Sequence, residues 1–229
     1  MNLDDRVSEV RQAVSDACDR SGRSIDDVII LPVTKGHPPE IIQQLNAYGF
    51  QQFGESKVQE AGYKATECSS GIDWHMIGHL QSNKARVAAS LFGTIHSVDS
   101  INILQKLDKE AGENGDRLDV YLQVNVANEH SKYGFATEAI PQALEAAQEL
   151  MNLNVVGLML IPPATDEAEN VRPWFAKLRE LRDEWRSESG FPLEELSMGM
   201  SNDYSIAIEE GATVVRLGRC LVGPRKKGL

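Results

Sequence analysis

The feature that most constrains the fold is a regular alternation of short apolar strands with amphipathic helices along the 229 residues. Eight strands are predicted, and nearly every one is followed by a helix. Their residue ranges are 28–33, 50–53, 73–77, 93–98, 119–126, 155–161, 196–198 and 213–217. Strict alternation implies right-handed crossovers and a parallel sheet. Eight such units in roughly 200 residues fit a closed (β/α)8 TIM-type barrel better than an open doubly wound sheet.

The helices are predicted from apolar residues spaced three and four apart. An extra helix over residues 3–20 precedes the first strand, and the longest helix is expected over residues 166–187. Ser82 is expected to cap the helix after the third strand. The glycine-rich fingerprint of dinucleotide-binding open sheets is missing after the first strand. We therefore expect one barrel domain over residues 1–229.

Composition excludes several classes of function. The formal net charge of −11 argues against a general binder of nucleic acid or anionic membranes, because such proteins need a basic surface. No apolar run approaches the ~20 residues of a membrane span, and the start lacks an apolar signal region. The three cysteines, at positions 18, 68 and 220, show no metal-like spacing and indicate a reducing cytosol. We expect a cytoplasmic protein, and a monomer because no obvious apolar helix face is left over.

A lysine follows the first strand, which is nearly all apolar over residues 28–33 and is predicted to be fully buried. Lys35 lies at the carboxyl end of this strand, and residues 36–39 read Gly-His-Pro-Pro, a turn. Desolvation disfavours the charged ammonium, which makes Lys35 a candidate amine nucleophile for a carbonyl. The alternative interpretation is a lysine whose ammonium extends to solvent.

The last two strands end in glycine-containing stretches on the face where barrels carry their functional loops. Met200 and Ser201 follow the seventh strand, and Gly218 and Arg219 follow the eighth. In barrels these loops commonly hold a phosphate between backbone N–H groups. A lysine and a phosphate site on one rim predict pyridoxal 5′-phosphate held as a Schiff base. A phosphorylated sugar on an aldolase lysine is the competing chemistry.

Arg216 bears on this choice. Its neighbours Val215 and Leu217 are apolar, so strand alternation places Arg216 on the opposite face from both. An arginine that faces inward would donate to the pyridine nitrogen and keep it unprotonated, which weakens the ring as an electron sink. The alternative is a structural ion pair inside the barrel.

Several stretches of the chain resemble the pyridoxal-phosphate homeostasis proteins. The resemblance covers nearly the whole chain, and its motifs are Val33-Thr34-Lys35, Phe53-Gly54-Glu55-Ser56-Lys57-Val58-Gln59-Glu60, Trp74-His75-Met76-Ile77-Gly78-His79-Leu80-Gln81-Ser82-Asn83-Lys84, Val156-Gly157-Leu158-Met159, Leu196-Ser197-Met198-Gly199-Met200-Ser201 and Val215-Arg216-Leu217-Gly218. The segment over residues 75–84 is highly specific. The resemblance implies a barrel like the N-terminal domain of bacterial alanine racemases, with pyridoxal phosphate bound covalently.

The resemblance also implies roles for individual residues. By position in the motifs, Lys35 forms the Schiff base, Arg216 faces the ring nitrogen, and Ser201 with the amides of Gly218 and Arg219 holds the phosphate. The full implied set is Lys35, Ser56, Met200, Ser201, Arg216, Gly218 and Arg219.

Two positions depart from the family pattern. Ser56 stands where the family usually has asparagine, so a hydrogen bond at the ring is expected to be shorter or water-mediated. Arg219 stands where serine or threonine is usual, which removes a hydroxyl contact to the phosphate. The backbone amide of Arg219 remains, and its guanidinium either compensates or points to solvent.

Efficient catalysis is not expected. Racemisation needs one acid/base group on each face of the reacting centre, and Lys35 serves only one. In two-domain racemases a tyrosine from a C-terminal domain serves the other, whereas this sequence ends at Leu229, eleven residues after Gly218. The resemblance implies a carrier acting in vitamin B6 homeostasis and amino-acid and keto-acid balance, with pyridoxal-phosphate-dependent apoenzymes as candidate recipients.

Two other functions stay open. The first is a slow amino-acid racemase that uses Lys35 with His79, Asp99 or a bound water as the second acid/base. The second is a signalling module whose docking surface is regulated by cofactor occupancy. The three histidines His75, His79 and His96 do not have the spacing of a metal site, so none is predicted.

Overall fold

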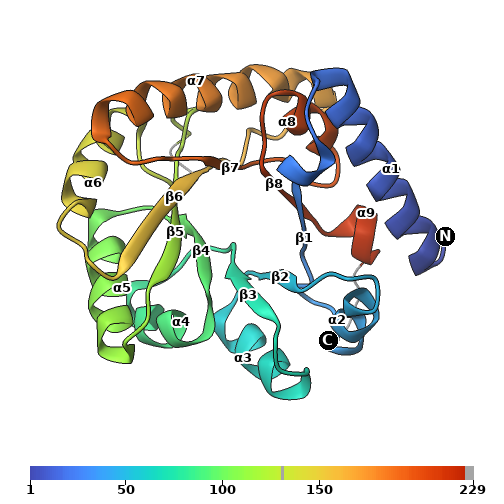
Figure 1. The fold of residues 1–229 in the computed structure, drawn as a ribbon, viewed down its shortest axis with the longest axis horizontal. Coiled ribbons are helices and arrows are strands. Elements are labelled where there is room, and N and C mark those ends of the chain that lie inside the picture. The colour runs from blue at the N-terminus through green and yellow to red at the C-terminus, as the bar shows by residue number, and fades with distance from the viewer. Residues whose placement is uncertain (130–131, 225–229) are drawn as a thin grey trace.

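Eight parallel strands form one sheet in the computed structural model, which describes residues 1–129 and 132–224 (Figure 1). They are β1 (Ile29–Pro32), β2 (Gln52–Glu55), β3 (Asp73–Met76), β4 (Thr94–Val98), β5 (Leu118–Gln123), β6 (Leu153–Met159), β7 (Glu195–Ser197) and β8 (Val214–Leu217). The strands follow the order β1-β8-β7-β6-β5-β4-β3-β2, so from β2 to β8 each strand pairs with the next one in sequence, and β1 pairs with β8.

The two edges of the sheet meet just beyond β1. Val33 pairs with Gly54 of β2 as an isolated parallel bridge, and the Thr34 backbone N–H donates to the Gly54 carbonyl at 3.2 Å. On its other side β1 pairs with β8 from Ile29 to Pro32. This contact brings the ring of strands nearly to closure, and the predicted (β/α)8 barrel is confirmed.

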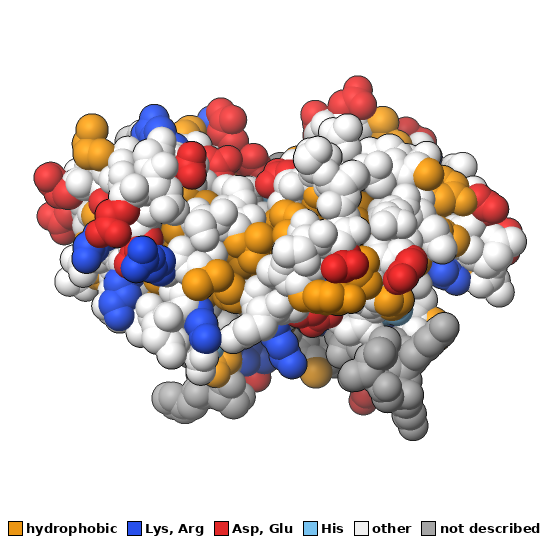
Figure 2. Space-filling model, turned by 90° about the horizontal axis from the view of Figure 1, so that it is seen from below, with side chains coloured by type: hydrophobic (Ala, Val, Ile, Leu, Met, Phe, Trp, Pro, Cys, Tyr) orange, Lys and Arg blue, Asp and Glu red, His pale blue; other side chains and the backbone are white. Residues whose placement is uncertain are grey.

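Helices form an outer ring around the strands (Figure 1). They are α1 (Leu3–Ser21), α2 (Glu40–Asn46), α3 (Val58–Glu67), α4 (Ala85–Leu91), α5 (Ile101–Asn114), α6 (Ile140–Ala147), α7 (Arg172–Ser189), α8 (Tyr204–Glu209) and α9 (Arg219–Val222). None of the described helices combines the length and apolarity that a membrane crossing requires. On the face drawn in Figure 2, several acidic side chains lie along the upper edge of the molecule among basic and hydrophobic ones.

The predicted extra helix at the N-terminus is confirmed as α1. Asn2 caps it by accepting from the backbone N–H of Asp5, whose carboxylate accepts from the Asn2 N–H in return. Gly22 ends it in the left-handed conformation with φ of 67°. Arg6 donates to the carbonyls of Leu221 and Val222, which ties α1 to α9.

Two apolar clusters hold the barrel. The larger lies between the strands and the outer helices, where α1, for example, buries its apolar stripe. The smaller lies inside the ring of strands and consists of Leu31, Val33, Ile77, Tyr121, Met159 and Val214. Polar side chains share this interior, and several of them matter for the site.

Several predicted boundaries were wrong. The second strand was expected at residues 50–53 but lies at Gln52–Glu55, because Gly54 pairs with His75 and continues the ladder instead of breaking it. The helix expected from residue 166 begins at Arg172 after a 3₁₀ turn. Pro173 explains this start, since proline is tolerated in a first turn but removes a hydrogen bond from a helix interior. Ser82 lies in a 3₁₀ turn and Lys84 occupies the N-cap of α4.

Candidate functional site

A cavity of about 520 Å³ opens where β1, β7 and β8 end. Five of the seven predicted site residues line it: Lys35, Met200, Ser201, Gly218 and Arg219. Its size lies within the range of pockets that hold small ligands and cofactors. The barrel therefore brings together residues that are more than 160 positions apart in sequence, as the prediction required.

The end of β1 positions Lys35. A turn follows the strand directly, closed by a hydrogen bond from the His37 N–H to the Thr34 carbonyl at 3.0 Å. Gly36 supplies the positive φ of 73° that this turn uses. Lys35 is half-buried at the rim of the cavity, consistent with the predicted strand-end lysine.

The loops after β7 and β8 are tied to each other. The Cys220 backbone N–H donates to Ser201 Oγ at 3.3 Å, and the Arg219 guanidinium donates to Asn202 Oδ1 at 2.9 Å. Within the first loop, the Met200 N–H donates to the Asp203 carboxylate at 2.6 Å. Arg219 is exposed and lines the cavity, so its side chain spans the two loops instead of extending straight into solvent.

Gly199 shapes the first of these loops. Its φ is +93°, and a Cβ there would lie 2.6 Å from the Ala207 Cβ and 3.1 Å from the Tyr204 Cα of α8. A side chain at this position would both strain the backbone and push α8 away from β8.

We predict that Gly199→Ala lowers the free energy of unfolding by about 2 kcal/mol, roughly half from the backbone and half from the contacts with α8. Gly190→Ala is the matched control, because Gly190 has φ of +76° with nothing within 4 Å of an added Cβ. The free energy of unfolding of this control variant should fall by about 1 kcal/mol. Urea denaturation of both variants measures the difference, and equal losses would contradict the proposed crowding at Gly199.

Arg216 lies beneath the cavity, inside the barrel, with 4% of its surface exposed. Its Nη1 donates to Ser197 O at 2.6 Å and Ser197 Oγ at 2.8 Å, and its Nη2 donates to Leu160 O at 2.8 Å. Within the described chain these hydrogen bonds go to neutral oxygens and not to a carboxylate, which differs from the structural ion pair that was the alternative prediction for Arg216. Burial lowers the pKa of Arg216 to about 10, so the guanidinium stays charged at neutral pH.

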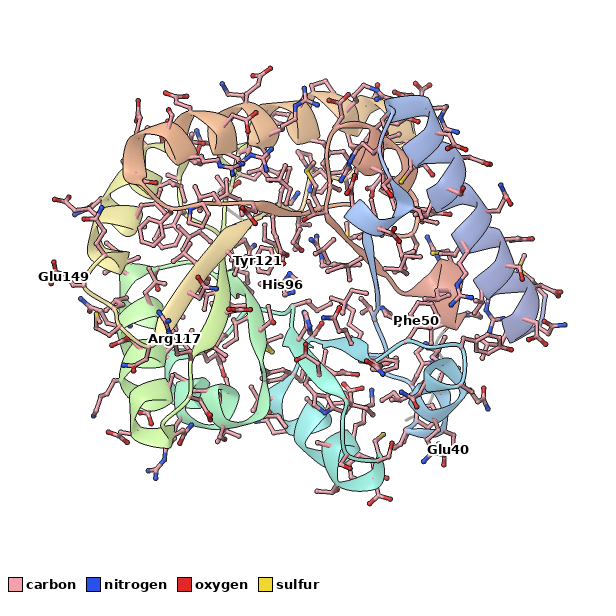
Figure 3. The ribbon with its side chains drawn as sticks, in the orientation of Figure 1. Glu40, Phe50, His96, Arg117, Tyr121 and Glu149 are labelled. Atoms are coloured by element: carbon pink, nitrogen blue, oxygen red, sulfur yellow. The ribbon has the colours of Figure 1, made fainter. Side chains whose placement is uncertain are left out.

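A chain of buried hydrogen bonds leads from Ser197 through the barrel interior. Ser197 Oγ lies 2.8 Å from His96 Nδ1, His96 Nε2 lies 2.9 Å from His75 Nδ1, and His75 Nε2 lies 3.1 Å from Asp73 Oδ2. Figure 3 shows His96 and Tyr121 together at the centre of the ring, and their rings stack with centroids 4.2 Å apart. Tyr121 in turn hydrogen-bonds Glu195.

The donors and acceptors in this series of hydrogen bonds have a preferred direction. Ser197 Oγ accepts from Arg216, which leaves its hydroxyl hydrogen available to His96 Nδ1, and with Nδ1 as acceptor His96 donates from Nε2 to His75. In this arrangement His96 is neutral. Burial, reinforced by His75 and Arg216, lowers its pKa well below the ordinary value of 6.5.

We predict that this neutral histidine makes the protein sensitive to acid. Below pH 6.5 the unfolded chain takes up a proton at His96 whereas the folded protein does not, so stability falls as the pH falls. The loss is about 1.4 kcal/mol per pH unit down to the lowered pKa of the folded state. Urea denaturation between pH 7 and 5 should show a shallower pH slope for His96→Gln than for the native sequence. Parallel slopes would contradict a neutral His96.

A buried ion pair lies beside the end of β1, and the sequence did not single it out. Lys64 of α3, 1% exposed, donates to Glu55 Oε1 at 2.6 Å, to Glu60 Oε1 at 2.8 Å and to the Thr34 carbonyl at 2.8 Å. Thr34 Oγ1 also donates to Glu55 Oε1 at 2.7 Å. Thr34, the residue before Lys35, is therefore held by hydrogen bonds to two buried charged side chains, Glu55 and Lys64.

Ser56, like Arg216, is a predicted site residue that does not line the main cavity. It lines a neighbouring cavity of about 210 Å³ at the ends of β2 and β3. Its Oγ is buried and has no hydrogen-bond partner among the described residues. His79 lines the same cavity, and its Nδ1 lies 2.9 Å from Asp99 Oδ2, so these two candidate acid/base residues are in contact.

Comparison with known proteins identifies the family of this chain. Residues 15–226 match the family described as the alanine racemase N-terminal domain. The pyridoxal phosphate homeostasis protein of Aquifex aeolicus is 42% identical over 99% of this chain and all of its own length. PipY of Synechococcus elongatus superimposes with a TM-score of 0.88 without pyridoxal phosphate, at 35% identity over 97% of this chain and 100% of its own. With pyridoxal phosphate bound, the TM-score is 0.87 at 34% identity, over the same shares of the two chains.

An alanine racemase of Clostridium difficile shares the fold alone. It superimposes with a TM-score of 0.75 at 15% identity, over 96% of this chain and 56% of its own. The family match covers most of the chain, and the Aquifex relative matches it from end to end. The chain therefore belongs to the pyridoxal phosphate homeostasis protein family, whose barrel is that of the alanine racemase N-terminal domain.

Proposed function

We propose that this chain, as one barrel domain over residues 1–229, binds pyridoxal 5′-phosphate covalently on Lys35 and acts in vitamin B6 homeostasis without efficient catalysis. The observation that carries the proposal is the cavity in which Lys35 faces the loops after β7 and β8. Membership of the family and the PipY structure with pyridoxal phosphate bound support it. When bound, the cofactor supplies an aldehyde for imine formation and an aromatic ring that withdraws electrons.

The residues of the cavity fit such a group. The primary amine of Lys35 would condense with the aldehyde and release water. Ser201 Oγ and the backbone N–H groups of Gly218 and Arg219 would hold the phosphate, and the Arg219 guanidinium would add charge to that end. Met200 would contribute an apolar contact at the wall, and Ser56 would border the cofactor from the adjoining cavity.

Arg216 supports a carrier over an enzyme. Three of the five N–H groups of its guanidinium are used by Ser197 and Leu160, which fix its plane. We propose that a remaining N–H faces the ring nitrogen. A guanidinium that stays charged cannot take a further proton or give one up easily, so it would keep that nitrogen unprotonated and limit electron withdrawal. Delivery to apoenzymes and a monomeric state remain predictions.

One observation favours slow racemisation as a second candidate function. His79 is held by Asp99 at 2.9 Å and would be the second acid/base group beside Lys35. Exchange of the Cα hydrogen of alanine for solvent deuterium, followed by NMR with the cofactor-loaded protein, tests this candidate. Exchange that His79→Gln abolishes would support it, and no exchange with any of the common amino acids would exclude it.

The first experiment for the main proposal is reconstitution of the purified protein with pyridoxal phosphate. We expect a visible absorption band that borohydride bleaches, and peptide mass mapping should place the reduced adduct on Lys35. No band after reconstitution, or an adduct mainly on another lysine, would overturn the proposal.

A further inference from the structure

The cavity beside Ser56 has a cationic lining. Its walls include Lys57, His79 and Lys84, and none of its lining residues is an aspartate or glutamate. Neither ammonium group forms a hydrogen bond or ion pair within residues 1–129 and 132–224. In a protein with a net charge of −11, such a concentration of cations in one hollow favours an anionic ligand.

Two carboxylates beside the cavity are already engaged. Glu60 accepts from Lys64 at 2.8 Å and from the Gly36 N–H at 2.5 Å, and these hydrogen bonds, more than the charge of Lys57, lower its pKa. Asp99 accepts from His79 at 2.9 Å, which also holds that imidazole in place. The ring of Tyr133 stacks on His79 with a centroid distance of 3.7 Å. These contacts leave the ammonium groups of Lys57 and Lys84 to act on a ligand.

A neutral donor lies beside the same cavity. Ser56 lines it, and its Oγ is buried without a partner in the described chain, so a rotation of this side chain would turn an unused hydroxyl toward a ligand oxygen. Helix α3 also begins here, and its N-cap residue Lys57 provides no side-chain cap to the first turn within the described residues. Gly78 borders the same end of β3, where an added Cβ would collide with the Ser56 carbonyl oxygen, so the two strand ends are in direct contact.

Size and position restrict the ligand. The cavity of about 210 Å³ is smaller than the main cavity of about 520 Å³ and has room for a carboxylate on a short carbon chain. Thr34, the residue before Lys35, donates its backbone N–H to Gly54 O at 3.2 Å and its Oγ1 to Glu55 Oε1 at 2.7 Å, and Ser56 follows Glu55 directly. A ligand in this cavity would therefore lie at the strand end adjoining the one that leads into Lys35.

We propose that this cavity is a subsite for the carboxylate of a small amino acid or 2-oxo acid. Lys57 and Lys84 would hold the carboxylate, Ser56 Oγ would donate to it, and the carbon that bears the amine or carbonyl would face Lys35. This inference deepens the proposed function and rests on it for the choice of amino and oxo acids. Binding of the carboxylate itself does not require the cofactor.

The test is an NMR titration of cofactor-free protein with sodium pyruvate and, separately, with L-alanine. We expect one or both to bind, and the double variant Lys57→Gln/Lys84→Gln to bind at least about tenfold more weakly, the factor that corresponds to losing one charge-assisted hydrogen bond. Lys109→Gln is the matched control, since it removes a lysine charge on the exposed face of α5. It should leave the affinity unchanged.

The outcomes separate this subsite from the cofactor site. Binding of pyruvate or alanine that depends on Lys57 and Lys84 supports the subsite, even if the protein fails to take up pyridoxal phosphate. Uptake of pyridoxal phosphate on Lys35 with no binding of either carboxylate, or with equal binding by the double variant, overturns it. Binding of inorganic phosphate without either carboxylate also overturns the assignment.

Discussion

Lys35→Ala is expected to abolish the borohydride-stable adduct on the peptide that contains residue 35. Covalent binding of the cofactor requires a primary amine at the rim of the main cavity, and alanine provides none. We expect total incorporation of pyridoxal phosphate to fall at least about tenfold, because losing 1.4 kcal/mol of binding energy already gives that factor. The measurement is absorbance together with mass spectrometry of the intact and digested protein.

The control for this prediction is Lys109→Ala, which removes an exposed lysine of α5 and should incorporate the cofactor like the native sequence. Lys35 is half-buried at a turn and belongs to neither apolar cluster, so the variant should still unfold cooperatively in urea, and its denaturation curve serves as the check that it is folded. A folded Lys35→Ala protein that still binds one equivalent of cofactor covalently would show that Lys35 is not the residue that carries the cofactor.

The position of Lys35 could be predicted because it depends on local pattern. A buried strand followed by a turn fixes where the strand ends, and parallel strands of a barrel end on one face. The same reasoning placed Ser201 and Gly218 opposite Lys35, and the structure brings them into one cavity. Strand alternation likewise predicted that Arg216 lies apart from Val215 and Leu217, and Arg216 does point into the barrel.

What the sequence could not predict depends on contacts between strands that are distant in sequence. His96 contacts Ser197, 101 residues further along, and no local pattern indicates that the two share the barrel interior. Ser56 was expected in the same cavity as Lys35, but the direction of its side chain depends on how β2 and β3 end against each other. The loop after β8 forms the short helix α9, which is too short to give a periodic signal.

The burial of Lys64 could have been predicted from its spacing in the sequence. Val58, Ala61 and Lys64 are spaced three residues apart in α3, and all three are buried, so the lysine lies on the apolar face of its helix. A charged residue in such a position is rarely buried unless it is paired. The preceding strand ends in Glu55, and that sequence proximity would have indicated the partner.

We expect Lys64→Met to lower the free energy of unfolding by 3 to 5 kcal/mol at neutral pH, roughly the cost of breaking a buried pair by removing one partner. Methionine keeps the volume and the apolar stem but leaves Glu55, which is fully buried, without its counter-charge. Burial already raises the pKa of Glu55 above its ordinary value despite the hydrogen bond from Lys64. Urea denaturation of both proteins at pH 7 measures this decrease in the free energy of unfolding.

Two controls and a pH series make this prediction specific. Lys109→Met breaks the exposed pair with Glu113, whose atoms lie 3.7 Å apart, and should cost no more than about 0.5 kcal/mol. Glu55→Leu/Lys64→Met replaces both buried charges by apolar groups and should recover most of the loss.

The pH dependence of Lys64→Met has a definite sign. Without Lys64 the folded-state pKa of Glu55 rises further above the ordinary value of 4.5, so protonation of Glu55 stabilises the folded variant as the pH is lowered. The difference in the free energy of unfolding between Lys64→Met and the native protein should therefore become smaller as the pH is lowered from 7 to 5. A difference that stays constant across this range, or a loss below about 1 kcal/mol at pH 7, would mean that water replaces the lysine and that Glu55 is not held as a buried charge.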